Sequence, residues 1–119
     1  MKYKILIVDD ALFMRAKIKK ILDTMECEII EASNGEEGCK AFESFRPDLV
    51  LLDISMPVMN GLEALEKMIQ VDSSIPVIMC SAIGQDTQVM KAINLGAKEF
   101  ITKPFTEEQI IKTVKNFLK

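Results

Sequence analysis

Five short apolar segments, separated by stretches with helical spacing, constrain the fold of this chain more than any other feature. They occupy residues 4–8, 28–32, 48–52, 76–80 and 99–102. In several of them, such as KILIV and DLVLL, apolar residues follow one another directly instead of alternating with polar ones. This pattern is typical of strands that helices cover on both faces of a parallel sheet.

The stretches between these segments are typical of amphipathic helices. In ALFMRAKIKKILDTM, basic residues are interleaved with an apolar set that comprises Leu12, Phe13, Ala16, Ile21, Leu22 and Met25. Asn34 and Thr106 are predicted N-caps, because Glu37 and Gln109 follow them by three residues. Strand and helix alternate five times, which predicts one α/β domain over residues 1–119, with an open parallel sheet and right-handed crossovers.

Composition excludes several classes of function. Lys and Arg total 15 against 18 Asp and Glu, and this net charge of −3 argues against nucleic-acid binding. No apolar run approaches the roughly 20 residues that span a bilayer, and the N-terminus lacks a signal-peptide pattern. Three cysteines without C-x-x-C spacing favour a reducing compartment. We therefore expect a cytoplasmic monomer without membrane insertion; the lack of histidine also excludes a Ser-His-Asp triad.

Polar side chains follow four of the five predicted strands. Asp9 and Asp10 follow the first, Asp53 the third, Ser81 the fourth and Lys103 the fifth. In open α/β sheets the functional site lies at the carboxyl ends of the strands, so these side chains are expected to converge. Each also has a simpler interpretation taken alone. Asp10 could cap a helix and Asp53 could begin a turn. Ser81 could be a satisfied hydroxyl at a strand end, and Lys103 a solvated surface charge. The set as a whole is harder to explain in that way.

Electrostatics indicates what such a cluster would bind. Three carboxylates carry −3 and one lysine carries +1, which leaves −2, and clustered like charges are costly unless they are balanced. Mg²⁺ prefers oxygen ligands, few carboxylates, several waters and a phosphate group. A carboxylate beside such an ion can attack a phosphoryl donor and form an acyl phosphate. The residues therefore predict Mg²⁺-dependent phosphoryl transfer to an aspartate.

Four motifs, VDDALFMR, LLDISMPVMNG, CSAIG and ITKPF, occur in an order and spacing that resembles the receiver domain of two-component response regulators. The resemblance covers essentially the whole chain. It implies a doubly wound, flavodoxin-like (βα)₅ fold with strand order 2-1-3-4-5. It also implies a signalling protein rather than an enzyme, with activity limited to phosphorylating and dephosphorylating itself.

The resemblance implies a role for each site residue. Asp53 would be the phosphoacceptor, and Asp9, Asp10 and Asp53 would bind Mg²⁺ together with the backbone carbonyl of Ser55. Asp10 would bind directly and Asp9 directly or through water. Ser81 would donate a hydrogen bond to a phosphoryl oxygen.

The lysine motif and the switch residues are implied in the same way. Lys103 would pair with the phosphate, and a cis peptide bond would precede Pro104. Phe100, Val89 and Met90 are the expected switch and partner surface, although Val89 and Met90, the latter above all, could instead pack in the core. Two positions depart from the common family pattern, because Ser81 stands where threonine is frequent and Phe100 where chemotaxis regulators often carry tyrosine.

The expected partners are a histidine kinase as phosphodonor, together with a chemotaxis or flagellar switch protein and a phosphatase. The sequences VDDALFMR and CSAIGQ favour chemotaxis. A phosphorelay intermediate, or a receiver that regulates another enzyme in trans, is the alternative. An aspartate-dependent phosphatase of the haloacid dehalogenase type would need D-x-D after the first strand, whereas the aspartates here are adjacent. A flavin mononucleotide binder would need a hydroxyl- and glycine-rich loop at that position.

Overall fold

The computed structural model describes residues 2–118 as strands and helices that alternate along the chain. The strands are β1 (Tyr3–Val8), β2 (Cys27–Ala32), β3 (Leu49–Asp53), β4 (Val77–Ser81) and β5 (Glu99–Thr102). The helices are α1 (Leu12–Leu22), α2 (Gly35–Phe45), α3 (Gly61–Val71), α4 (Asp86–Leu95) and α5 (Glu107–Phe117). The predicted strands are within one residue of the observed bounds at every end, because each apolar run ends at a turn.

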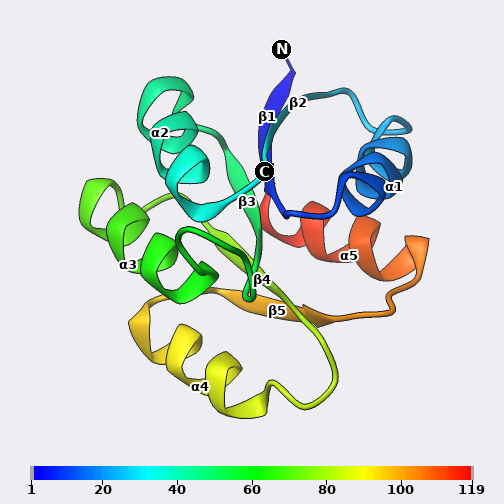
Figure 1. The fold of residues 1–119 in the computed structure, drawn as a ribbon. Coiled ribbons are helices and arrows are strands. Elements are labelled where there is room, and N and C mark those ends of the chain that lie inside the picture. The colour runs from blue at the N-terminus through cyan, green and yellow to red at the C-terminus, as the bar shows by residue number, and fades with distance from the viewer. Residues whose placement is uncertain (1, 119) are drawn as a thin grey trace.

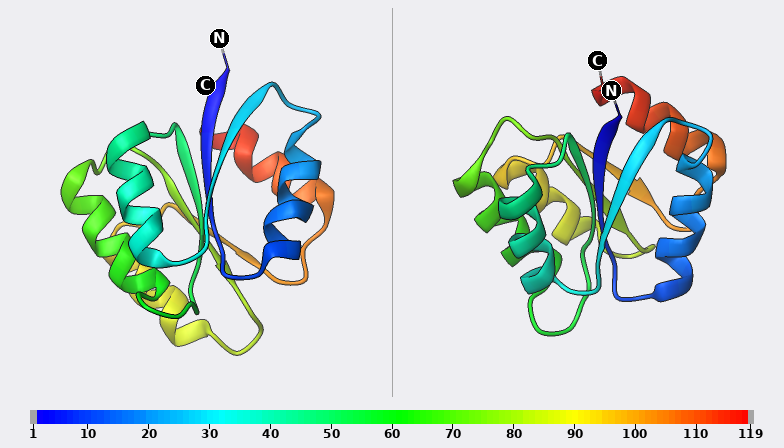
Figure 2. Two further views of the ribbon diagram at one scale, coloured as in Figure 1. Left: turned by 45° about the horizontal axis from the view of Figure 1, so that its top comes forward. Right: turned by 90° about the horizontal axis from the view of Figure 1, so that it is seen from above.

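All four strand pairings are parallel, and the strand order is β2-β1-β3-β4-β5. The predicted fold class and sheet order are thus confirmed. Helices α1 and α5 cover one face of the sheet, and α2, α3 and α4 cover the other (Figures 1 and 2). The order reverses at β1, which has β2 on one side and β3 on the other. The carboxyl ends of β1 and β3 therefore lie at the switch point where such folds place their sites.

The central strands β3 and β4 are buried along their full length, which explains their continuous apolar sequence. Successive side chains enter two different cores. Leu6 and Val8 face α2 and α3, whereas Ile5 and Ile7 face α1 and α5. A strand with one core on each face has no position left for a polar side chain until it ends. The first polar residues therefore appear at the strand ends.

Helix starts follow the predicted caps. The Asn34 side chain accepts a hydrogen bond from the Glu37 N–H at 2.9 Å, and Thr106 forms a capping box with Gln109. Helix α4 ends at Gly96, whose φ of +119° is the left-handed conformation that glycine adopts without strain. These signals are local, which is why the sequence alone was enough to find them.

Helix α1 differs from the prediction at its first turn. Ile18, Ile21 and Leu22 are buried, but Leu12 and Phe13 are exposed beside the strand ends. The apolar pattern of this segment continues beyond the part of the helix that the sheet covers. None of the helices among residues 2–118 has both the length and the apolar character needed to cross a membrane.

Candidate functional site

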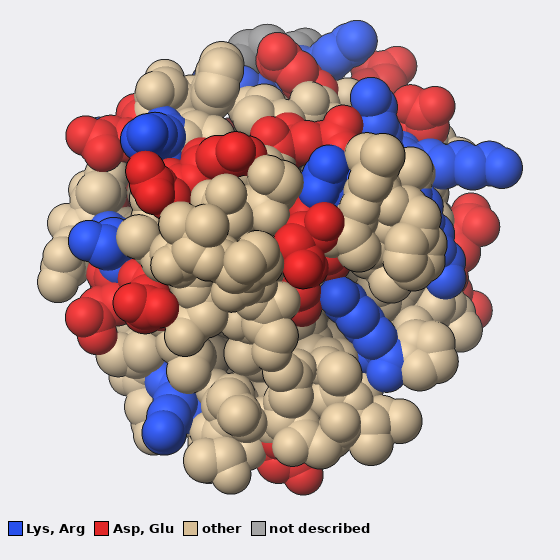
Figure 3. Space-filling model, viewed as in Figure 1, with Lys and Arg blue, Asp and Glu red and all other residues tan. Residues whose placement is uncertain are grey.

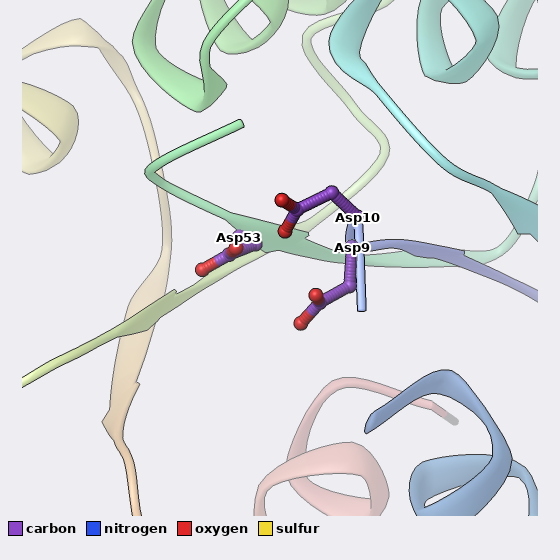
Figure 4. Close-up of side chains that lie close together, drawn as sticks. All are labelled: Asp9, Asp10 and Asp53. Atoms are coloured by element: carbon purple, nitrogen blue, oxygen red, sulfur yellow. The ribbon is translucent and has the colours of Figure 1, made fainter. Parts of the chain in front are cut away.

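Three carboxylates meet where β1 and β3 end. Asp9 and Asp10 directly follow β1, and Asp53 is the last residue of β3. The two strands are neighbours in register, with Val8 opposite Leu52, so Asp9 and Asp53 lie side by side. One oxygen of each carboxylate lies within 4.8 Å of the others. Figure 4 shows the three side chains leaving the two strand ends toward one side of the sheet edge.

Lys103 supplies the positive charge at this cluster. Its Nζ lies 2.9 Å from Asp9 Oδ2 and 3.2 Å from Asp53 Oδ1, so one ammonium bridges two carboxylates. The lysine is held in place from β4, because its backbone N–H donates to the Ser81 carbonyl at 2.6 Å. The peptide bond between Lys103 and Pro104 is cis, as the resemblance implied. Figure 3 shows acidic side chains recessed near the middle of this face, with basic side chains beside them.

Asp9 is bonded through every polar group it has. Its N–H donates to the Ala32 carbonyl at 3.1 Å, and its Oδ1 accepts from the Ala11 N–H at 2.9 Å. Its carbonyl accepts from Arg15 Nη1 at 2.5 Å, and Oδ2 receives Lys103. The alternative interpretation of Asp10 as a helix cap is wrong, because Ala11 is the N-cap residue of α1 and no side chain caps that helix. Asp9 bonds the loop N–H instead, which leaves the exposed Asp10 carboxylate available for another partner.

Asp53 is strained electrostatically. Burial, reinforced by the negative charge of Asp9 and opposed by Lys103, raises the pKa of Asp53 to about 6. Burial alone would lower the pKa of Lys103, but its bond to Asp9 and the charges of Asp53 and Asp9 outweigh that effect and raise it. The lysine therefore stays charged at neutral pH. The negative charge is compensated only in part, since two carboxylates share one ammonium and Asp10 adds a third.

The donor set fits a small divalent cation. Carboxylate oxygens are the hard ligands that Mg²⁺ prefers, and a doubly charged ion would balance the remaining −2. Asp9, Asp10 and Asp53 are the residues that could hold it. Ser55, two residues beyond β3, is exposed, and its hydroxyl accepts a hydrogen bond from Gln85 Nε2 at 2.7 Å. The role expected for the Ser55 carbonyl stays a prediction.

Ser81 ends β4 on the other side of β3, and it is buried at 2% exposure. It pairs with Thr102, one residue before Lys103, while Cys80 pairs with Asp53. Ser81 is thus brought to the same edge of the sheet as the carboxylates, as predicted. Burial raises the pKa of the Cys80 thiol to about 12, so this cysteine is a protonated core residue at neutral pH.

The expected switch residues lie apart from the acidic cluster, on α4 and β5. Phe100 is 44% exposed and Met90 is 62% exposed. Val89 is only 7% exposed and belongs to the core between the sheet and α2, α3 and α4. The expectation that Val89 lies on a partner surface is therefore wrong. The helical period turns Val89 toward the sheet and its neighbour Met90 away from it.

Three further features of this edge were not found from the sequence. Arg15, one of the basic residues interleaved with the apolar set of this segment, is only 13% exposed and bonds the Asp9 carbonyl. Gln85 bonds both the Ala82 N–H and the Ser55 hydroxyl, which links two loops. Val58 is exposed and has a φ of +70°, a conformation that a β-branched residue rarely adopts. All three depend on how separate loops meet, which no local pattern records.

Comparison with known proteins identifies the class. The family model described as response regulator receiver domain matches residues 5–115, and this chain belongs to that family. The chemotaxis protein CheY of Listeria monocytogenes is 48% identical over 117 residues, which cover 98% of both chains. The chemotaxis protein CheY of Bacillus subtilis is 44% identical over 119 residues and 99% of both chains.

Solved structures agree with this assignment. A CheY-like response regulator receiver domain from Methanospirillum hungatei superimposes with a TM-score of 0.93 at 29% identity, covering 98% of this chain and 93% of that one. The structure of NtrX from Brucella abortus gives a TM-score of 0.92 at 31% identity. This chain spans only 27% of the NtrX chain, so that likeness concerns the receiver fold alone.

Proposed function

We propose that this receiver domain accepts a phosphoryl group on Asp53 in the presence of Mg²⁺ and signals in chemotaxis through phosphorylation-dependent protein binding. The observation that carries the proposal is the burial of Asp53 beside Asp9 and Lys103, with a pKa raised to about 6. At neutral pH such a carboxylate is mostly ionised and remains a better nucleophile than an ordinary one. The relatives named CheY support the chemotaxis role.

In the proposed reaction, one oxygen of Asp53 attacks the phosphorus of a phosphohistidine on a sensor kinase. The bond from phosphorus to the imidazole nitrogen breaks as the bond to Asp53 forms, and the histidine leaves with its electron pair. Lys103, which already contacts both Asp9 and Asp53, would pair with the phosphoryl oxygens. Mg²⁺, held by Asp9, Asp10, Asp53 and the Ser55 carbonyl, would supply further charge neutralisation.

The signal would follow from the new phosphoryl oxygens. The Ser81 hydroxyl would donate to one of them, and the end of β4 would move toward Asp53. Phe100, half-exposed on the neighbouring strand, would then turn inward and change the surface of α4 and β5. Converting a 1:99 population of two states into 99:1 requires about 5.5 kcal/mol of differential stabilisation. Phosphate contacts from Lys103, Ser81 and the metal are charge-assisted or metal-bound, and they supply energies of that order.

The test is phosphorylation by acetyl phosphate with MgCl₂, followed by intact-mass spectrometry. The wild type should gain one phosphoryl group, and Asp53→Asn should gain none. Asp23→Asn is the matched control, because it removes an exposed aspartate remote from the site. Equal labelling of the Asp53 variant would disprove the acceptor assignment. Intrinsic fluorescence is a poor substitute, since the chain has no tryptophan and a single tyrosine, Tyr3.

The output is tested with the phosphoryl mimic beryllofluoride. Chemotaxis or flagellar switch proteins should bind the beryllofluoride form selectively, together with a phosphatase. Transfer of the phosphoryl group from Asp53 to a histidine phosphotransfer protein would instead indicate a relay. Selective capture of an enzyme whose activity changes would indicate regulation in trans.

A further inference from the structure

Arg15 connects three elements around the β1–α1 loop. It lies on the first turn of α1, its Nη1 donates to the Asp9 carbonyl at 2.5 Å, and its Nε donates to Glu31 Oε1 at 3.1 Å. Glu31 belongs to β2, on the far side of β1 from Asp53. Lys19 lies 3.7 Å from the other oxygen of Glu31 and holds that carboxylate from a second direction. The Arg15 guanidinium is thus oriented by Glu31 of β2, and it bonds the main chain directly after β1.

The carbonyl that Arg15 bonds belongs to the peptide between Asp9 and Asp10. This peptide is planar, so the direction of its carbonyl also fixes where the Asp10 Cα, from which the side chain departs, is placed. Asp9 has further bonds through its N–H and its carboxylate, whereas the Asp10 carboxylate makes no hydrogen bond or ion pair with residues 2–118. Within this part of the chain, the orientation of Asp10 therefore depends on its backbone.

We infer that Arg15 is a positioning residue of the metal centre. It holds the Asp9–Asp10 peptide so that the Asp10 carboxylate faces Asp53, and Glu31 holds Arg15. This inference rests on the proposed Mg²⁺ site, and it assigns a function to two residues that touch neither the metal nor the phosphoryl group. Residues that orient metal ligands from outside the coordination sphere commonly change metal affinity by tenfold or more when they are replaced.

Charge and positioning predict opposite results, which makes the inference testable. Arg15 is a cation near an acidic cluster, so its removal should strengthen Mg²⁺ binding if only the electric field mattered. If Arg15 acts by holding the peptide, its removal should weaken Mg²⁺ binding although a repulsive charge has gone. A purely structural role would lower the melting temperature but leave the affinity of the folded protein unchanged.

The experiment is a titration of the folded protein with MgCl₂, followed by two-dimensional NMR of the backbone amides well below the melting temperature. Arg15→Met should weaken Mg²⁺ binding about tenfold. Arg46→Met is the matched control, because Arg46 forms an exposed ion pair with Asp72 at 3.5 Å. The Mg²⁺ affinity of this variant should match that of the wild type. Equal or tighter binding by Arg15→Met would overturn the inference.

Two further results keep the test decisive. If Arg15→Met does not fold, Arg15→Lys retains the charge but cannot bond both the Asp9 carbonyl and Glu31 in the same geometry. Its affinity should fall by a few-fold, and an affinity equal to that of the wild type would overturn the inference. If the wild type itself does not bind Mg²⁺, the failure lies with the proposed metal centre and not with Arg15.

Discussion

The two halves of the sheet hold their functional side chains in different ways. At the ends of β1 and β3, Asp9 and Asp53 are 2% and 8% exposed, and Asp9 is bonded through its backbone and both carboxylate oxygens. Along α4 and β5, Phe100 and Met90 project into solvent. β5 is one of the two edge strands and is only four residues long. Helix α4 has Gln85 as its N-cap residue and no side-chain cap, whereas α3 and α5 both have complete capping boxes.

This difference corresponds to the two tasks proposed above for this domain. Phosphoryl transfer requires groups held to a fraction of an ångström, and burial with several hydrogen bonds achieves this. A surface that changes its partner requires elements of low local stability, such as an edge strand and an uncapped helix. The two halves meet at Lys103, which follows β5 but bonds Asp9 and Asp53. The predictions below test this contrast in order of decreasing effect.

Lys103→Met tests the contact between the halves. The substitution leaves two buried carboxylates without their cation, so we expect a loss of about 3 kcal/mol of unfolding free energy in metal-free buffer at pH 7. Added Mg²⁺ should reduce this loss, because the ion would replace the missing positive charge. Urea unfolding with and without Mg²⁺ measures both quantities. Lys98→Met, at an exposed position just before β5, should change neither, and equal stability of the two variants would contradict the contrast.

Asp53→Asn tests whether the acidic half is strained without metal. Because the pKa of Asp53 is raised from its usual range to about 6, the folded state binds this proton more tightly than the unfolded state. The free energy of unfolding of the wild type should therefore decrease as the pH rises from about 4 to about 6. The total decrease due to Asp53 is at most about 3 kcal/mol. Asp53→Asn removes this term and should be the more stable protein at pH 7 in EDTA. Thermal unfolding against pH measures the difference.

An exposed aspartate provides the control for that experiment. Hydrogen bonds from Ser74, reinforced by the charge of Arg46, lower the pKa of Asp72. A carboxylate with a lowered pKa stabilises the folded protein at a pH above its pKa in the unfolded chain, and this stabilisation is lost as the pH falls. The effect of pH on stability is therefore opposite to that of Asp53. Asp72→Asn should therefore not stabilise the protein at pH 7. A gain of equal size in both variants would mean that the effect is not specific to the buried site.

Val58→Asn tests strain in the loop between β3 and α3. A β-branched residue at a φ of +70° costs about 1–2 kcal/mol, and asparagine tolerates that conformation better. Since Val58 is 75% exposed, little packing is lost. We expect a gain of about 1 kcal/mol, which is a rise of a few degrees in melting temperature. Val71→Asn, at the last residue of α3, should give no such gain, and a lower melting temperature for Val58→Asn would refute the strain.

Phe100→Ala tests how loosely the half of the sheet formed by α4 and β5 is packed. Because the ring is half-exposed on an edge strand, we expect a loss of less than about 1 kcal/mol. The matched substitution Phe42→Ala removes a ring that is 1% exposed in the core and should cost about 3–5 kcal/mol. Chemical denaturation of the two variants compares them directly. Similar losses would mean that Phe100 is part of the core and not of a mobile surface.

The sequence was sufficient for those features that depend on neighbouring residues or on the general rules of parallel sheets. The apolar runs, the caps at Asn34 and Thr106 and the convergence of Asp9, Asp53 and Lys103 follow from such rules. The features that were missed or wrong depend on the exact meeting of separate elements. Tertiary packing decides whether the Asp10 side chain caps α1. It also decides which residues of α4 face the sheet. Arg15 was missed for the same reason, because its partners lie on β2 and in the loop after β1.

The contact at Gly61 limits how the molecule can respond to a reaction at Asp53. A Cβ atom at this glycine would lie 2.1 Å from the Asp53 carbonyl oxygen, and the Gly61 N–H donates to the Ile54 carbonyl at 2.7 Å. The first turn of α3 is therefore in direct main-chain contact with the end of β3, with no side chain between them to rearrange. In terms of degrees of freedom, β3 and α3 count as one body. We therefore expect a displacement of the end of β3 to move the first turn of α3 with it.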